Sequence, residues 1–254
     1  MLSILIRHVI FVNNDRKVHE MRIDKFLTEL GVGSRSEVKK IIKNGQITVN
    51  GTPVKKAELQ IDETKDEVTY QGKILCYQQF EYYMFHKPAG CVTAVTDAVH
   101  KTVMDYMKNL TRKDLNPVGR LDIDTEGLLL ITNDGMLSHE LLSPTKHVPK
   151  TYYAKVEGKV AEEDVNLFLK GVDIGEKKPC KPAELKVLVS DAVSEIELTI
   201  SEGKFHQVKR MFEAVDKKVL YLKRISMGKL TLDENLKPGE YRPLTEQEIE
   251  ELRR

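Results

Sequence analysis

The chain has 254 residues, enough for one large domain or for a medium domain with a small companion. Hydrophobic residues make up 41% and charged residues 31%, a balance that excludes a largely disordered chain. The formal net charge is only +1, so a strongly charged surface requires that basic and acidic residues be concentrated in different segments. The three cysteines are far apart and form no Cys-x-x-Cys pair, which argues against a disulfide framework or a cysteine zinc site and fits a cytoplasmic location.

The first 20 residues are expected to be an N-terminal extension of unknown role. Their apolar stretch is interrupted by Arg7 and His8 and is too short to span a membrane. A domain is therefore predicted to begin at Met21.

Two helices and a hairpin are predicted in the segment that follows. Residues 22–30, "RIDKFLTEL", carry apolar side chains at helical spacing, and "GVG" ends that helix. Ser34 stands three residues before Glu37, the spacing of a capping box, and so opens a second helix. Asn50 and Gly51 then indicate a tight hairpin between two short strands.

Residues 21–60 carry eight basic side chains against four acidic ones, a net +4. On charge alone, a merely solvated helix face and a surface that contacts phosphates both remain open. An acidic cluster around residues 62–67 ends this segment, and residues 61–80 lead into a linker.

From about residue 81 the pattern is one of strands with interspersed helices. Alternating runs such as "SEIELTI" are typical of half-buried antiparallel strands, and no glycine-rich phosphate loop follows a strand, which disfavours a nucleotide-cofactor fold. The expected strands are 82–86, 91–95, 128–132, 151–158, 183–190, 194–200 and one near 224–230, and the expected helices are 102–110, 136–142, 161–170 and 206–215.

The stretch "DIDTEG", residues 122–127, has three alternating acids that allow several interpretations. It imitates the start of a calcium loop, but position 12 of such a loop is Asn133 rather than the required glutamate. A structural turn before the apolar run "LLLIT" explains Asp124 and Glu126 well. Asp122 follows "GRL" and borders that rigid strand, so it is also a candidate for a reactive carboxylate.

Longer motifs decide between these interpretations. "GRLDIDTEGLLLITNDG", "KTYYAKVEG" (150–158), "EGKFHQVKRMF" (202–212) and "LKPGEYRPLT" (236–245) resemble the pseudouridine synthases, in the branch of the ribosomal small-subunit enzymes. The segment "MRIDKFLTELGVGSRSEVKKIIKNGQITVNGTPV" resembles an S4 RNA-binding domain, so the likeness runs from Met21 almost to Arg254. One departure is His86, because the family usually has an asparagine before the motif "KP-G".

The resemblance implies an α+β fold with two domains. A small helix-helix-hairpin S4 domain with a linker would occupy residues 21–80, and a synthase domain would occupy 81–254, with a mostly antiparallel mixed β-sheet flanked by helices. The implied activity is site-specific isomerisation of uridine to pseudouridine in rRNA, above all in 16S rRNA. It requires no cofactor and no metal, because the reaction has no redox step and no external group donor.

The resemblance also assigns roles to individual residues. Asp122 is the expected catalytic carboxylate, since the sugar carbon becomes electron-poor as the base leaves. Tyr152 rather than its neighbour Tyr153 is expected to stack on the pyrimidine and assist proton transfer. Lys209 is expected to pair with the carboxylate, while Arg210 points about 100° away. The residues expected to contact RNA are Arg22, Arg35, Lys39, Lys40, Lys43, Arg120, His206, Gln207 and Arg210.

Charge along the C-terminal part agrees with an RNA-facing surface. Residues 201–229 carry eight basic side chains against three acidic ones, whereas residues 231–254 carry four against seven. The expected partner is structured ribosomal RNA, either 16S rRNA or a small-subunit assembly intermediate. The protein is expected to be a monomer and to bind no membrane. A synthase acting on 23S rRNA and a non-catalytic S4-type assembly factor remain the alternatives, although "EGKFHQVKRMF" favours the small-subunit group.

Overall fold

The computed structural model describes residues 20–75, 77, 79–108, 110 and 112–253. The predicted extension, residues 1–20, therefore lies outside the described part except for its last residue. The chain divides into two compact units, residues 1–78 with 111–113 and residues 79–110 with 114–254. No described helix is both long enough and apolar enough to cross a membrane.

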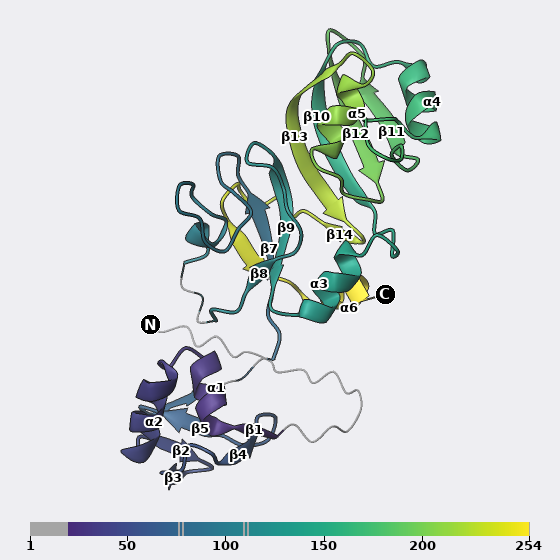
Figure 1. Ribbon diagram of the computed structural model, residues 1–254. Coiled ribbons are helices and arrows are strands. Elements are labelled where there is room, and N and C mark those ends of the chain that lie inside the picture. Colours follow the sequence, from purple (N-terminus) through teal and green to yellow (C-terminus); the bar gives the residue numbers. More distant parts are fainter. Residues whose placement is uncertain (1–19, 76, 78, 109, 111, 254) are drawn as a thin grey trace. The chain divides into compact units, whose positions relative to one another are not determined.

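The first unit holds two short helices on small antiparallel sheets (Figure 1). One sheet pairs β1 with β4, and the other has the order β3-β2-β5-β6. The elements are β1 (Glu20–Arg22), α1 (Ile23–Glu29), α2 (Arg35–Lys43), β2 (Ile47–Val49), β3 (Thr52–Val54), β4 (Gln60–Asp62), β5 (Val68–Tyr70) and β6 (Lys73–Leu75).

Local sequence accounts for both predicted boundaries in this unit. The Ser34 backbone N–H donates to Glu37 Oε2 at 2.8 Å, and the Glu37 N–H donates to Ser34 Oγ at 3.5 Å, which confirms the capping box. Asn50 and Gly51 have φ angles of 49° and 76°, the left-handed pair that a two-residue hairpin requires. The hairpin prediction is confirmed as well. The apolar stripes of both helices, with Phe26 and Ile42 at their centre, form one core with the strands.

The second unit is built on one large sheet, which confirms the predicted mostly antiparallel mixed fold. Its strand order is β11-β12-β10-β13-β9-β7-β15, with β14 on β13 and β8 on β9. All pairs are antiparallel except β9 with β13. The strands are β7 (Tyr82–Lys87), β8 (Asn116–Pro117), β9 (Glu126–Thr132), β10 (Lys150–Glu157), β11 (Glu184–Val189), β12 (Val193–Ile200), β13 (Lys218–Met227), β14 (Leu230–Thr231) and β15 (Tyr241–Pro243).

The parallel junction between β9 and β13 depends on a glycine. Gly127, at the start of β9, has φ +108° and is the register partner of Arg224. A Cβ atom at Gly127 would lie 2.2 Å from the Arg224 carbonyl oxygen, which is far inside van der Waals contact. Only glycine therefore allows the two halves of the sheet to meet here, directly after the acidic loop.

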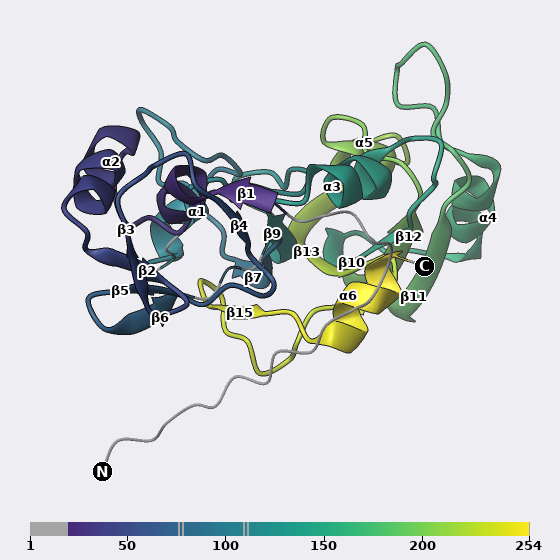
Figure 2. The same cartoon turned by 90° about the horizontal axis from the view of Figure 1, so that it is seen from below.

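Helices cover the two halves of this sheet separately. In one half, Phe168 of α4 and Phe212 of α5 pack on each other at 5.0 Å between ring centroids, within the core formed by β10 and β12. Helix α4 lies against β11, as Figures 1 and 2 show. In the other half, Leu137 of α3 and Leu252 of α6 join the core with β7 and β9. The helices are α3 (Gly135–Leu142), α4 (Glu162–Lys170), α5 (Gln207–Glu213) and α6 (Glu246–Arg253).

Two predicted elements in the second unit are wrong. Residues 91–95 form no strand, and only Val92 makes an isolated bridge, to Thr102. Of residues 102–108 and 110, only Met104–Tyr106 are helical, as a 3-10 turn. Asp105 accepts hydrogen bonds from the backbone and hydroxyl of Thr102 and closes a local turn instead. Their apolar side chains cover β7 and β9 as an irregular segment, with Val103 fully buried.

Candidate active site

The loop before β9 holds the backbone of Asp122 from several sides. Thr93 Oγ1 donates to the Leu121 carbonyl at 2.8 Å and accepts from the Leu121 N–H at 3.1 Å. The Thr125 N–H donates to the Asp122 carbonyl at 3.1 Å and closes the turn. The predicted turn is therefore present, and it fixes the position of the Asp122 side chain.

A fully buried lysine completes this loop. The ammonium of Lys87, at the end of β7, donates to the carbonyl oxygens of Asp122 and Thr125, both at 2.9 Å, and of Pro88 at 3.1 Å. Burial lowers the pKa of Lys87, and the nearby carboxylates oppose that shift. No carboxylate among the described residues bonds to this ammonium, so the carbonyl oxygens of the loop replace its water shell. Sequence reasoning missed this residue.

Lys209 forms ion pairs with two of the three acidic residues in the loop. Lys209 Nζ lies 3.3 Å from Asp122 Oδ2 and 2.6 Å from Asp124 Oδ1. Burial alone would lower the pKa of Lys209, but the hydrogen bond to Asp124 and the two carboxylate charges outweigh it, so the pKa lies above its ordinary value. Burial likewise opposes ionisation of Asp124, yet Lys209 holds the pKa of that carboxyl below its ordinary value. Glu126 instead accepts from the Tyr221 hydroxyl at 2.7 Å.

His206 approaches Asp122 from the other side. Its Nε2 lies 3.6 Å from Asp122 Oδ1, and its backbone has φ 48°, an uncommon left-handed conformation for a non-glycine residue. The ring of the preceding Phe205 stacks on the imidazole at 3.8 Å between centroids. Phe205 is 70% exposed, unusual for a residue of this size, and sequence reasoning missed it too.

Gln207, at the first position of α5, is buried and shapes the wall of the site. Its Nε2 donates to Glu202 Oε1, and its Oε1 accepts from the Lys204 N–H, both at 2.9 Å. These bonds fix the loop that carries His206. Gln207 thus holds this loop in place from inside the protein, and a direct contact with RNA stays a prediction.

Tyr152 and Tyr153 point to opposite faces of β10, as alternation along a strand requires. Tyr152 is buried and lines the same hollow as Asp122 and His206. The Tyr153 hydroxyl donates to Glu195 at 2.7 Å, and its ring meets Tyr221 edge-on at 6.1 Å. Burial is the larger cause and this hydrogen bond the next, and together they raise the pKa of Tyr153 to about 12. Of the two tyrosines, the structure brings only Tyr152 to Asp122.

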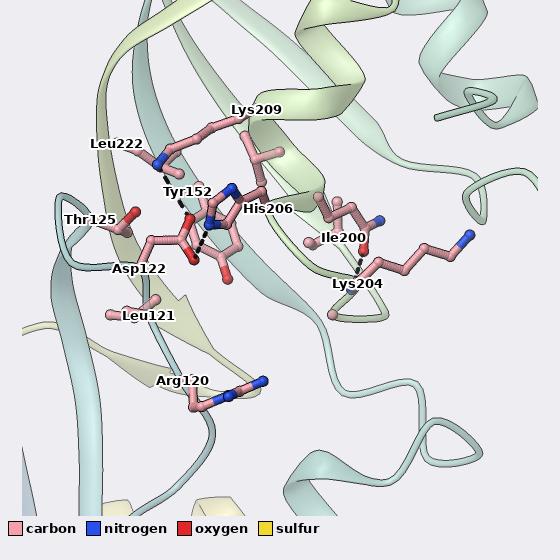
Figure 3. Close-up of a pocket in the computed structure, with 13 residues that line it drawn as sticks. Arg120, Leu121, Asp122, Thr125, Tyr152, Ile200, Lys204, His206, Lys209 and Leu222 are labelled. Carbon is pink, nitrogen blue, oxygen red and sulfur yellow. Dashed lines mark hydrogen bonds and ion pairs between the residues drawn. The ribbon is translucent and has the colours of Figure 1, made fainter. Parts of the chain in front are cut away.

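Two adjoining hollows share Asp122, Tyr152 and His206 in their lining. Figure 3 shows residues that line the smaller one. A small pocket of about 90 Å³ lies between Asp122, Tyr152 and Lys209. It opens beside a cleft of about 820 Å³ that Asp122, Tyr152 and His206 also line, together with Arg120 and Phe205. A cleft of this volume is large enough for a nucleotide. Arg120 lines both hollows, and its contact with RNA stays a prediction.

Arg210 is directed away from the cleft and bonded within the protein. Its guanidinium donates to Glu176 Oε1 at 2.8 Å and to the carbonyl oxygens of Ile174 at 2.6 Å and Phe205 at 3.2 Å. Lys209 is therefore the member of the pair that reaches Asp122. An RNA contact by Arg210 stays a prediction, and it would have to compete with these three bonds.

The five RNA-contact candidates of the first unit are all exposed. Arg22 is paired with Asp24 at 2.8 Å. The four candidates on α2 form no ion pair with any other described residue. They are Arg35, Lys39, Lys40 and Lys43.

His86 is buried away from both hollows. Its Nδ1 lies 2.6 Å from the Leu236 carbonyl oxygen, and burial lowers its pKa. The departure from the family motif at this position therefore alters a contact with the C-terminal segment rather than the lining of the cleft. Within the described residues, no group of three or more His, Cys, Asp or Glu side chains is placed to hold a metal ion.

Comparisons with known proteins agree with this geometry. A family model described as RNA pseudouridylate synthase matches residues 81–214, and the S4 domain model matches residues 21–68. The uncharacterised RNA pseudouridine synthase YtzG of Bacillus subtilis (strain 168) is 46% identical over 90% of this chain and 97% of its own length. The ribosomal small subunit pseudouridine synthase A of Escherichia coli (strain K12) is 44% identical over 90% of this chain and 98% of its own length.

The fold is matched as well. A crystal structure of a pseudouridylate synthase, 40% identical, superimposes with a TM-score of 0.65 and covers 91% of this chain and 99% of that one. The resemblance inferred from the motifs is thus confirmed over nearly the whole length. This chain belongs to the RNA pseudouridylate synthase family and carries an S4 domain in front of the synthase domain.

Proposed function

We propose that this protein converts one uridine of 16S rRNA to pseudouridine, with Asp122 as the catalytic carboxylate. The observation that carries the proposal is the convergence of Asp122, Tyr152 and Lys209, from a loop, a strand and a helix far apart in sequence, at one small pocket that adjoins a nucleotide-sized cleft. The small-subunit rRNA is the substrate named for the Escherichia coli relative at 44% identity.

The reaction is an isomerisation. The bond between N1 of uracil and C1′ of the ribose breaks, the base turns, and a bond forms between C5 and C1′. The proton on C5 leaves to solvent and N1 gains one, so neither a redox partner nor a group donor is needed. Asp122 supplies the negative charge that this rearrangement requires, at the sugar or at the base.

Tyr152 and Lys209 have separate tasks in this mechanism. The Tyr152 ring offers a face on which the uracil can stack while it is detached, and its phenol can assist the removal of the C5 proton. Lys209 and His206 hold the two oxygens of Asp122 from different directions, at 3.3 and 3.6 Å, and so restrict its rotation. A fixed carboxylate loses less entropy when the substrate arrives.

The target uridine has to leave the RNA stack before it reaches Asp122. Base flipping costs roughly a few kcal/mol. Contacts between the RNA backbone and the exposed basic side chains of α2 would offset part of this cost, which gives the S4 domain a physical purpose. We propose a monomer that acts in the cytoplasm on 16S rRNA, free or in a small-subunit assembly intermediate.

Pseudouridine mapping tests this proposal. Carbodiimide treatment and primer extension on rRNA from a strain without the gene should lose one stop in 16S rRNA, and expression of the wild-type gene should restore it. Loss of a stop in 23S rRNA instead would show that 23S rRNA, and not 16S rRNA, is the substrate. An unchanged map in both rRNAs, together with RNA binding by the purified protein, would favour a non-catalytic S4-type assembly factor.

A further inference from the structure

Two buried cations lie in the lining of the large cleft, and the mechanism above uses neither. Lys150 begins β10 and is 9% exposed, and Arg224 lies on β13 and is 2% exposed. Arg224 is the register partner of Tyr152, and Lys150 precedes Tyr152 by two positions. Both cations therefore belong to the part of the sheet that carries the proposed base-stacking ring.

Neither cation has a counter-ion in the part of the chain that the structure describes. Lys150 Nζ donates to the Val148 carbonyl at 3.0 Å, and Arg224 Nε donates to the Leu128 carbonyl at 2.8 Å. Arg224 Nη2 is buried and has no hydrogen-bond partner. No described carboxylate forms an ion pair with either residue, although an unpaired buried charge is among the costliest groups a fold can contain.

The acids that share the cleft are engaged elsewhere. Asp122 is held by Lys209 and His206, and Glu202 accepts from Gln207 Nε2 at 2.9 Å and from the Lys181 N–H at 2.8 Å. Burial lowers the pKa of Lys150, and the charge of Arg224 lowers it further. The two cations thus repel each other, and no described carboxylate is paired with either of them.

Another lysine of the same unit shows the usual arrangement. The partly buried Lys217 donates to Asp164 Oδ1 at 2.8 Å, at the opposite end of β10 and β13 and outside the lining of the cleft. Lys150 and Arg224 thus differ from this ion-paired lysine in having no carboxylate partner among the described residues.

We propose that Lys150 and Arg224 form a phosphate subsite that binds a backbone phosphate of the RNA at the target nucleotide. The ligand is a phosphodiester, whose oxygens accept from Lys150 Nζ and from the unpartnered Nη2 of Arg224. A nucleotide with its base on Tyr152 brings its own phosphate to neighbouring positions of the same strands. The phosphate supplies the missing charge, so binding and correct placement of the uridine are coupled. This inference rests on the proposed function and deepens it.

Substitution of Lys150 by methionine separates this role from a structural one. Lys150→Met keeps the length of the side chain and removes the buried charge together with its hydrogen bond to the Val148 carbonyl. Because the charge is unpaired, its removal should offset the lost bond, so we expect an unchanged or higher Tm. Binding to a 16S rRNA transcript should weaken about tenfold, and the plot of log K against log salt concentration should become shallower by roughly 0.7–0.9. Lys150→Arg should restore both. Lys150→Gln, which can still donate to Val148, repeats the test if the methionine variant does not fold.

Lys217→Met is the matched control. It leaves Asp164 without its partner, so Tm should fall while RNA affinity and its salt dependence stay as in the wild type. The opposite pattern, in which Lys150→Met lowers Tm and leaves the salt dependence unchanged, would overturn the subsite.

Two further measurements complete the test. Tritium release from C5-labelled uridine by the wild type shows whether the enzyme turns over at all, so that failure of the subsite and failure of the proposed function are distinguishable. Inorganic phosphate is tested by thermal shift. If it stabilises the wild type but not Lys150→Met, while both bind RNA equally, the site takes a free anion and the proposal is overturned.

Discussion

Lys209 is closer to Asp124 than to the proposed catalytic carboxylate: its Nζ lies 2.6 Å from Asp124 Oδ1 and 3.3 Å from Asp122 Oδ2. The Asp124 side chain is 65% exposed and the Asp122 side chain 28% exposed. One ammonium thus bridges a carboxylate at the surface and a carboxylate at the cleft. The shorter of the two contacts is not the one to the proposed catalytic carboxylate.

Asp124→Asn should therefore be a mild variant. An ion pair with one exposed partner contributes only about 0–1 kcal/mol to stability, and Lys209 can still reach Asp122 when Asp124 is neutral. We expect less than about a tenfold loss of kcat/KM and little change in KM. Steady-state tritium release measures both quantities. A loss as large as that of an Asp122 variant would show that the two acids act together.

The same ion pair should be visible in the pH dependence of stability. The pKa of Asp124 is below its ordinary 3.8, so its contribution is present above pH 3.8 and is lost as the pH falls through the lower folded-state pKa. The pKa of Lys209 is above its ordinary 10.5, so its contribution is present below pH 10.5 and is lost as the pH rises through the higher folded-state pKa.

The difference in Tm between the wild type and Asp124→Asn should accordingly be constant from about pH 5 to about pH 9 and should shrink below about pH 3. Scanning calorimetry across this range checks it. A difference that persisted undiminished at about pH 2 would contradict the ion-pair interpretation.

Lys87→Met should damage both the fold and the active loop. The substitution removes the donor shared by the carbonyl oxygens of Asp122 and Thr125 and leaves them buried. We expect a loss of about 2–4 kcal/mol in the free energy of unfolding. At a temperature where the variant is folded, kcat should fall about tenfold with RNA affinity unchanged, because the loop that aims Asp122 is loosened. Lys186→Met, on the exposed side of β11, is the control and should change neither. If Lys87→Met had the same free energy of unfolding in denaturant as the wild type, the proposed role of Lys87 in holding the loop would be refuted.

Phe205→Ala should weaken RNA binding without loss of stability. The ring is exposed in the cleft and already stacked on His206, so its free face is available to an unpaired base. Stacking of a base on an aromatic side chain is worth about 1–3 kcal/mol, which corresponds to roughly 5- to 150-fold in Kd. Phe205→Tyr should retain binding. The matched control is Met136→Ala, which removes another exposed apolar side chain from outside the cleft. Equal Kd values for the wild type and Phe205→Ala would exclude this contact.

Local patterns predicted much of the fold. The Ser34 capping box and the Asn50–Gly51 turn were readable because each depends on neighbours within a few residues. The segments 91–95 and 102–110 were misassigned for the same reason: their apolar side chains cover a sheet from an irregular path, and apolar composition does not reveal the path.

The site was predictable only in part. Asp122, Tyr152 and Lys209 were found through motifs, and the structure brings them together. Lys87, Lys150 and Arg224 were missed because a lysine or arginine in a sequence is expected at the surface, and their partners are carbonyl oxygens or absent altogether. Only coordinates show that such a charge is buried.

The most direct test of the catalytic role of Asp122 compares it with its neighbour. Tritium release from C5-labelled uridine in 16S rRNA is measured for Asp122→Asn and Asp124→Asn, after both variants are shown to bind RNA and to unfold like the wild type. The expected result is a loss of at least about a thousandfold in turnover for Asp122→Asn and less than about tenfold for Asp124→Asn. Turnover by Asp122→Asn within tenfold of the wild type would contradict the assignment.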